Sequence, residues 1–163
     1  MEIIETQRLL LRSFEAADQE TYVAFFTDAD FMQYSRAGAL DDASARESFI
    51  QRLSLSETLF TKLMIIEKST HQAIGYCGVD QCELEAKQEL ELGYRLIASA
   101  RGQGFATEAA RAVLDYYQQQ GIENIIAFTA HGNAPSQAVL KKLGFNAVKT
   151  GEIQSFPIVI FRR

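Results

Sequence analysis

The chain has 163 residues, of which 47% are hydrophobic and 23% charged; this suits one globular domain and excludes a disordered protein. The net charge of −5 argues against a nucleic-acid ligand, which requires a basic surface, and would suit a cationic substrate such as an amine. The first residues carry the acidic Glu2 and Glu5 where a signal peptide is basic, and no apolar run approaches ~20 residues, so we expect a soluble, cytoplasmic protein that does not enter a membrane.

Hydrophobic periodicity and turn residues predict ten elements along the chain. In order they are a strand at 8–14, helices at 16–27 and 42–55, strands at 60–67, 73–80 and 89–96, a helix from 106 to 121, a strand at 124–130, a helix from 133 to 144 and a strand at 156–161. Gly75 and Gly78 inside one strand indicate a bulge or a close approach of backbones. The order predicts a mixed α/β domain, antiparallel at first, with a strand–helix–strand crossover in its second half.

The strand at 89–96 shows the clearest alternation of apolar and polar residues. Its two faces carry Leu90, Leu92, Tyr94 and Leu96 on one side, and Glu89, Glu91, Gly93 and Arg95 on the other.

A glycine loop, residues 101–106, connects this strand to the long amphipathic helix that follows it. The unpaired N–H groups of a helix N-terminus attract anions, and glycines let the backbone curl around a phosphate. A Walker loop would need Lys-Ser or Lys-Thr where Phe105-Ala106 stands, and a dinucleotide fingerprint would need a third glycine or alanine at Thr107. The loop alone is therefore either a phosphate site of another kind or a structural turn.

The neighbouring motifs distinguish these possibilities. Arg101, Gly104 and Ala106 match a pattern that resembles the coenzyme A pyrophosphate loop of the GNAT superfamily of acetyltransferases. Asn133 and Ser136, followed by Gly-Phe at 144–145, resemble the second motif of that family, and residues 5–12 look like the start of the ribosomal-protein N-terminal acetyltransferases. The resemblance implies a single domain over 1–163, with a twisted and mostly antiparallel sheet, a splayed parallel strand pair and flanking helices.

The resemblance also implies a co-substrate, acetyl-CoA, in the gap between the splayed strands at 94–98 and 124–130. Unpaired backbone groups there would bond the pantetheine arm, and the loop would hold the pyrophosphate. The residues expected to bind it are Leu96, Ile97, Ala98, Arg101, Gly102, Gln103, Gly104, Phe105, Ala106, Thr107, Asn133, Ser136 and Lys141, with Lys142 an alternative to Lys141.

The implied reaction is direct attack of an amine on the thioester in a ternary complex, with a backbone N–H near Ile97 polarising the carbonyl. Many family members protonate the leaving thiolate with a tyrosine on the last motif helix, but residues 133–145 contain none. Ser136 is the candidate proton donor; alternatively, it is a first-turn residue that bonds backbone.

Glu91 is the first candidate for the general base and Glu89 the second, although both could be solvated strand residues. Tyr34 and Tyr94 are expected to shape the acceptor site. The isolated histidines are weak catalytic candidates. Cys77 and Cys82 do not form a zinc pattern, so we expect no metal and a reducing compartment.

The acceptor amine remains open at this stage. A protein N-terminus is the first choice, as the resemblance to the ribosomal-protein N-terminal acetyltransferases implies. Such an acceptor needs little help from a base, because at pH 7 an α-amine with a pKa of ~7.8 is neutral far more often than a lysine with a pKa of ~10.4. A small-molecule amine is the second choice of acceptor. Alternatively, the chain is a non-catalytic module that binds acyl-CoA. The chain could act as a monomer or pair its last strand across a homodimer.

Overall fold

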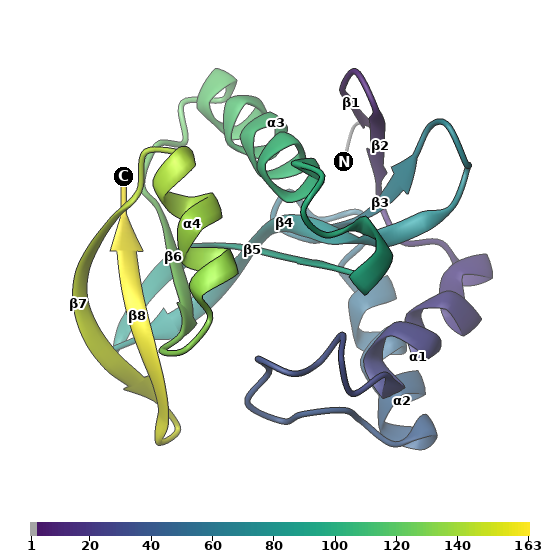
Figure 1. The fold of residues 1–163 in the computed structure, drawn as a ribbon, viewed down its shortest axis with the longest axis horizontal. Coiled ribbons are helices and arrows are strands. Elements are labelled where there is room, and N and C mark those ends of the chain that lie inside the picture. The colour runs from purple at the N-terminus through teal and green to yellow at the C-terminus, as the bar shows by residue number, and fades with distance from the viewer. Residues whose placement is uncertain (1–2) are drawn as a thin grey trace.

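The computed structural model describes residues 3–163 and contains one eight-stranded sheet with helices on both faces (Figure 1). The strand order is β1-β2-β3-β4-β5-β6-β8-β7, and every neighbouring pair is antiparallel except β5 and β6. The strands are β1 (Ile4–Glu5), β2 (Leu9–Arg12), β3 (Lys62–Glu67), β4 (Ala73–Leu84), β5 (Lys87–Leu96), β6 (Ile125–Ala130), β7 (Asn146–Ile153) and β8 (Phe156–Arg162). The predicted mixed α/β class with one parallel pair is confirmed.

Four α-helices and two short 3-10 turns complete the fold. They are α1 (Gln19–Thr27), α2 (Asp42–Ser54), α3 (Phe105–Gln119) and α4 (Ala134–Lys142), with 3-10 turns at Ala16–Asp18 and Ala98–Ala100. Helix α2 begins where the paired aspartates indicated, because Asp41 accepts a hydrogen bond from the Ser44 N–H at 2.7 Å as its N-cap.

The helices bury two different hydrophobic clusters on the two faces of the sheet. Helix α3 packs Ala109, Val113 and Tyr117 against inward residues of β2 to β6. On the opposite face, α1 and α2 form an aromatic cluster that reaches the sheet at Met64 and Tyr76. Figure 1 shows α3 and the α1–α2 pair on opposite sides of β4 and β5. The central strands are therefore covered on both faces.

Two hairpins make the second half of the sheet larger than the sequence indicated. Strands β4 and β5 continue beyond their predicted ends to a two-residue turn at Glu85 and Ala86, whose φ values are 53° and 60°. Gln154 and Ser155 turn in the same way between β7 and β8. Two consecutive positive φ angles are typical of a type I′ hairpin turn. Strand β7 was not predicted because it is exposed along almost its whole length and lacks apolar alternation.

The glycines of β4 mark close backbone contacts, as expected. A Cβ on Gly78 would lie 2.2 Å from the Thr61 carbonyl oxygen, and one on Gly75 would lie 2.0 Å from that of Arg95. The β3–β4 register shifts beside Gly75, between Ile65 and Ile66. These positions therefore require residues without a side chain.

The parallel pair opens shortly after it forms. Strands β5 and β6 are paired only at Leu90 with Ile125 and at Glu91 with Ile126. Beyond these positions β5 follows β4 to Leu96, whereas β6 follows β8 to Ala130. Beyond these two pairs the facing edges of β5 and β6 are no longer paired with each other, which confirms the predicted splay and positions the site.

Candidate active site

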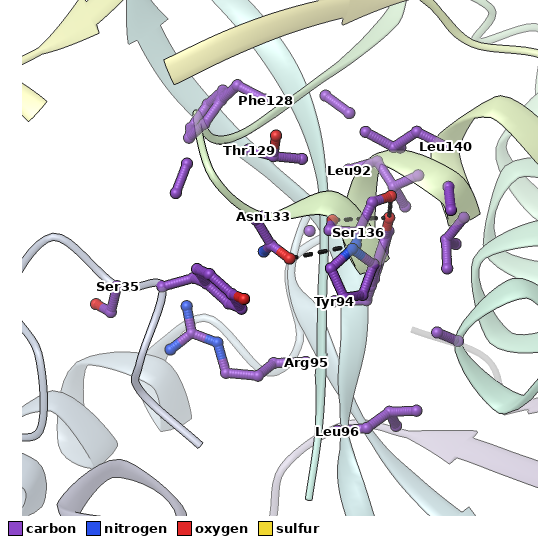
Figure 2. A pocket seen from close by; sticks show the side chains of 18 of the residues that line it. Ser35, Leu92, Tyr94, Arg95, Leu96, Phe128, Thr129, Asn133, Ser136 and Leu140 are labelled. Carbon is purple, nitrogen blue, oxygen red and sulfur yellow. Dashed lines mark hydrogen bonds between the residues drawn. The ribbon is translucent and has the colours of Figure 1, made fainter. Parts of the chain in front are cut away.

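A cavity of about 680 Å³ lies where β5 and β6 diverge. Its lining comes from β5, β6, the 101–107 loop, α4, the α1–α2 connection and the β7–β8 hairpin. Figure 2 shows Tyr94 and Ser136 facing each other on one side, with Arg95 directed away from them towards Ser35. The volume suits a small organic ligand or the reacting portion of a larger one.

The glycine loop at one end of the cavity has the geometry of an anion site. Gly102 and Gly104 have φ values of 72° and 81°, which favour glycine, and Gly104 is the N-cap of α3. The first intrahelical bond runs from Glu108 N–H to the Gly104 carbonyl at 3.0 Å, so the N–H groups of residues 105–107 precede the ladder. Those three residues line the cavity, and a phosphate there would meet their N–H groups and the helix dipole.

Not every residue expected to bind acetyl-CoA lies on the cavity wall. Those that do are Leu96, Arg101, Gly102, Gly104, Phe105, Ala106, Thr107, Asn133 and Ser136. Ile97, Ala98, Gln103 and Lys141 do not, and Lys142 lines the wall in place of Lys141. The Ile97 N–H, expected near the thioester carbonyl, instead donates to the Ile74 carbonyl at 2.9 Å. A backbone donor for the thioester carbonyl would therefore come from the unpaired edge of β5 before Ile97.

Arg101 is fixed at the rim of the cavity. Its Nε donates to the Leu96 carbonyl at 3.1 Å, and its Nη1 lies 2.9 Å from Asp30 Oδ2. The arginine of the loop motif therefore connects β5 to the α1–α2 connection.

The N-terminal segment holds the first turn of α3, a role that the sequence did not reveal. Glu108 accepts hydrogen bonds from Thr6 Oγ1 at 2.7 Å and from the Arg8 N–H at 3.0 Å, and Arg8 Nε bonds its other oxygen. Burial raises the pKa of Glu108, but these donors together hold it below the usual range. Arg8 also donates to the Gln103 carbonyl and lies 4.3 Å over the Phe105 ring. The segment that resembles the family's start thus holds the glycine loop and the first turn of α3 in place.

Helix α4 presents a bonded hydroxyl pair to the cavity. Asn133 caps the helix by accepting from the Ser136 N–H at 3.2 Å. Ser136 Oγ donates to Tyr94 Oη at 3.0 Å, and Tyr94 Oη donates to the Ser136 carbonyl at 2.9 Å. Burial raises the pKa of Tyr94, so the phenol is protonated at neutral pH. Ser136 is both a bonded first-turn residue and a member of a hydroxyl pair at the opening.

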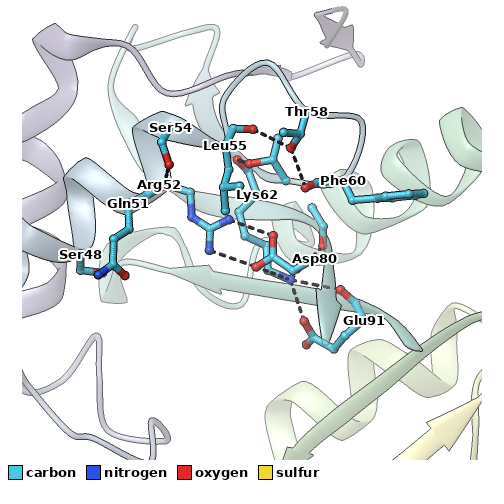
Figure 3. A network of polar contacts seen from close by, with 12 residues as sticks. Ser48, Gln51, Arg52, Ser54, Leu55, Thr58, Phe60, Lys62, Asp80 and Glu91 are labelled. Carbon is cyan, nitrogen blue, oxygen red and sulfur yellow. Dashed lines mark hydrogen bonds and ion pairs between the residues drawn. The ribbon is translucent and has the colours of Figure 1, made fainter. Parts of the chain in front are cut away.

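Glu91 belongs to a buried charge network on the face of β5 opposite to that of Tyr94 (Figure 3). Lys62 Nζ donates to Glu91 Oε2 at 2.7 Å and lies 3.8 Å from Asp80 Oδ2. Arg52 makes a bidentate pair with Asp80 at 2.8 and 3.0 Å. Burial lowers the pKa of Lys62, but the carboxylates of Glu91 and Asp80 raise it more, so the lysine stays charged. Glu91 and Lys62 both line the cavity.

The second base candidate has a different position. Glu89 accepts from Arg162 Nη2 at 2.6 Å and is not on the cavity wall, although it lies on the same face of β5 as Glu91. Glu89 is therefore paired with Arg162 of the C-terminal strand β8, and of the two glutamates only Glu91 reaches the cavity.

The α1–α2 connection forms the remaining wall. Tyr34 lines the cavity and is 36% exposed, and Arg36 and Arg95 line it too. Neither arginine was predicted as a site residue, although the alternation of β5 had placed Arg95 on the polar face with Glu91. Neither His71 nor His131 lies on the cavity wall.

Residues 3–163 hold no group of three or more His, Cys, Asp or Glu side chains arranged to bind a metal ion. None of the helices in this part of the chain has the length and apolar character needed to span a membrane.

Comparison with known proteins agrees with this geometry. Residues 8–146 match the model of the acetyltransferase (GNAT) domain family. The chain is 32% identical over 161 residues to the uncharacterized protein YkkB of Bacillus subtilis, covering 97% of this chain and 93% of that protein. It is also 32% identical over 148 residues to the uncharacterized N-acetyltransferase p20 of Bacillus licheniformis, covering 89% and 83%.

A solved structure shows the same fold. The ribosomal L7/L12 alpha-N-protein acetyltransferase RimL, in complex with coenzyme A, superposes with a TM-score of 0.79 at 17% identity, covering 99% of this chain and 97% of that one. The fold and the relatives define an acyl-group transferase. The chain belongs to the GNAT family of N-acetyltransferases.

Proposed function

We propose that the chain transfers the acetyl group of acetyl-CoA to the α-amine of a peptide or protein N-terminus, by direct attack of the amine on the thioester. One observation carries the proposal: a single cavity joins the glycine loop to Glu91 across the gap between β5 and β6. The anion site and the carboxylate stand at different parts of the same opening, so one wall can hold the donor while the other receives the acceptor.

The residues present fit acetyl-CoA. The pyrophosphate would meet residues 102–107 at the start of α3, and the pantetheine amides would pair with the open edges of β5 and β6. Thr129 Oγ1, on β6, is the buried side-chain polar atom left without a hydrogen-bond partner in the described chain, and Thr129 lines the cavity. A buried hydroxyl without a partner is costly, so a polar ligand arm beside β6 is favoured.

Glu91 is proposed to receive the acceptor ammonium and remove its proton. Its Oε2 is engaged by Lys62, whereas no hydrogen bond within residues 3–163 engages Oε1. The side chain is 13% exposed and lines the cavity, so an amine entering the cavity can reach it. A fixed carboxylate orients the amine more precisely than a solvated one.

The Ser136–Tyr94 pair is proposed to protonate the leaving thiolate. Ser136 would turn its hydroxyl from Tyr94 Oη to the sulfur and release its proton there. The Tyr94 phenol would turn from the Ser136 carbonyl to return a proton to Ser136 Oγ, and it would recover its own proton from solvent. A thiol has a pKa of ~8.5, so its thiolate leaves readily and this assistance is modest.

An α-amine is the acceptor that such a site serves best. At pH 7 about one α-amine in 7 is neutral, compared with about one lysine amine in 2,500. RimL, a structural neighbour, is described as an alpha-N-protein acetyltransferase. Small-molecule amines are the second acceptor class and belong in the same screen.

The test has two parts. Acetyl-CoA at about 100 times its Kd should stabilise the protein by ~2.7 kcal/mol and raise Tm, whereas NADH and ATP should not. Gly104→Val should abolish the rise, because a β-branched residue fits neither φ +81° nor the phosphate. Gly121→Val, at φ +77° beyond α3, is the matched control that should keep it.

Thiol release is then measured with N-terminal peptides and small amines. Release that depends on a free α-amine and falls at least 100-fold in Glu91→Gln supports the proposal. A Tm rise without release for any amine would show a non-catalytic acyl-CoA-binding module instead.

A further inference from the structure

The cavity is positively charged although the chain is acidic. Its charged lining residues comprise one carboxylate, Glu91, and five cations: Arg36, Lys62, Arg95, Arg101 and Lys142. The whole chain carries a net charge of −5. A cation-rich cleft in an acidic protein focuses an attractive field on anions. The overall charge of the chain therefore does not describe the charge of this cleft.

Some of these cations are neutralised within the fold. Lys62 pairs with Glu91, and Arg101 pairs with Asp30. Lys142 is close to the first turns of α3, where its backbone carbonyl accepts from Arg111, and it belongs to the phosphate end. Within residues 3–163, Arg36 and Arg95 form no ion pair.

Arg95 is held in place by contacts that leave its charge uncompensated. Its guanidinium carbon lies 5.7 Å from the Phe31 ring centre and 6.0 Å from that of Tyr76, and Nη1 lies 2.6 Å from Met32 Sδ. Aromatic faces and a thioether are weak partners for a half-buried guanidinium, which normally takes a carboxylate or phosphate. The side chain is thus positioned on the wall with its strong hydrogen-bonding capacity unused.

Its place relative to Glu91 indicates which substrate it serves. Glu91 and Arg95 project from the same face of β5, four residues apart, so their Cα atoms are about 13 Å from each other. That face carries the α1–α2 aromatic cluster, whereas the phosphate-binding helix α3 covers the other. Figure 2 shows Arg95 directed towards Ser35 and away from Tyr94. Arg95 therefore faces the acceptor.

We propose that the acceptor amine belongs to a molecule with a carboxylate that Arg95 binds, assisted by the exposed Arg36: a peptide whose second or third residue is Asp or Glu. The inference rests on the proposed function, since it takes the amine to react beside Glu91. About 13 Å corresponds to about four residues of extended chain, and the lengths of the two side chains shorten the span to two or three. The planar guanidinium suits a bidentate bond to a carboxylate.

The experiment compares acceptors that differ only in charge. Thiol release from acetyl-CoA is measured with hexapeptides of one sequence carrying Glu-Glu, Gln-Gln or Arg-Arg at positions 2 and 3, and with free glutamate and glutamine. We expect kcat/KM for the Glu-Glu peptide to exceed that for Gln-Gln by about tenfold or more, mainly through KM. A preference seen only with free glutamate would overturn the peptide assignment.

Arg95→Met keeps the stem against Phe31 and Tyr76 but removes the charge, so it should bring the Glu-to-Gln ratio close to one. Arg46→Met is the matched control, because Arg46 pairs with Glu20 and Asp42 on the outer surface and should leave the ratio unchanged. A Tm equal to that of the native chain would show that Arg95→Met folds.

The two proposals fail in different ways. Equal use of Glu-Glu and Gln-Gln peptides would overturn the carboxylate inference and leave the acetyl transfer standing. Absence of thiol release with every amine would overturn the proposed function. In that case calorimetry with the coenzyme A-loaded protein still tests Arg95 directly: tighter binding of Glu-Glu than of Gln-Gln supports it, and equal or absent binding overturns it.

Discussion

Lys62 Nζ donates to Glu91 Oε2 at 2.7 Å by crossing the whole width of β4. The crossing is possible because Lys62 is in register with Gly78 on β4, which is in register with Gly93 on β5. The lysine side chain passes over two residues without side chains, and it donates to the carbonyls of Gly78 and Glu91 at 3.2 Å each. The position of the candidate base is therefore set by residues on three strands.

Gly93→Ala should disrupt this arrangement. A Cβ at this position would lie 2.6 Å from Lys62 Nζ and 2.9 Å from Glu91 Oε1, so one of the charged groups must move. We expect a loss of about 1–3 kcal/mol in the free energy of unfolding, measured by urea denaturation. Gly132→Ala is the control, because nothing lies within 4 Å of its added Cβ. Equal stability of the two variants would contradict the packing described for Lys62.

Removing the lysine itself should cost more. Lys62→Met leaves Glu91 without its partner in a site where the lysine side chain is 8% exposed and the glutamate 13%. Breaking a buried pair from one side typically costs about 3–5 kcal/mol, whereas replacing both partners with apolar residues is close to neutral.

The double variant Lys62→Met/Glu91→Leu should therefore recover most of the lost free energy of unfolding. Additive losses in this double-mutant cycle would show that the two residues do not interact. Lys149→Met, which removes a surface pair with Glu85, should have little effect in the same assay.

The same network predicts a dependence of stability on pH. Burial raises the pKa of Asp80, but Lys62 and Arg52 lower it more, so that it stays below the ~3.9 of a free aspartate. A carboxyl group whose pKa is lowered by folding stabilises the native state above its unfolded pKa, and that stabilisation is lost as the pH falls through the folded value.

Asp80→Asn should accordingly destabilise the protein at pH 7, and the difference from the native chain should shrink below about pH 4. Urea denaturation at a series of pH values measures it. A difference that stays constant from pH 7 to pH 3 would mean that the lost contact is not electrostatic.

The sequence predicted the parts of the fold and site that depend on local pattern. The glycine loop, the capped helix at Asn133 and the alternation of β5 each lie in one continuous stretch of sequence. All three were predicted, and the two faces of β5 were assigned correctly. Lys62 was missed because a lysine inside an apolar strand is normally assigned to the surface. Its burial follows from glycines that register places opposite it, 16 and 31 positions away in the chain. Pairings of this kind depend on tertiary structure.

The hydroxyl pair at the opening provides the last prediction. Ser136→Ala and Tyr94→Phe each remove one hydroxyl of the bonded pair, and each should lower the rate of thiol release. The expected loss in kcat is about tenfold to 100-fold, because a thiolate with a pKa near ~8.5 leaves readily without an acid. If the pair acts as one unit, the double variant should lose no more than the worse single variant.

The readout that separates catalysis from packing is the leaving group. An acyl donor whose thiol has a lower pKa needs less protonation, so it should restore the rate of both variants towards that of the native chain. Acetyl-CoA binding, followed through the rise in Tm, should be unchanged in Tyr94→Phe if the phenol serves the proton alone. If the rate loss were the same for every leaving group, the pair would be structural, and Ser136 would act only as a first-turn residue of α4.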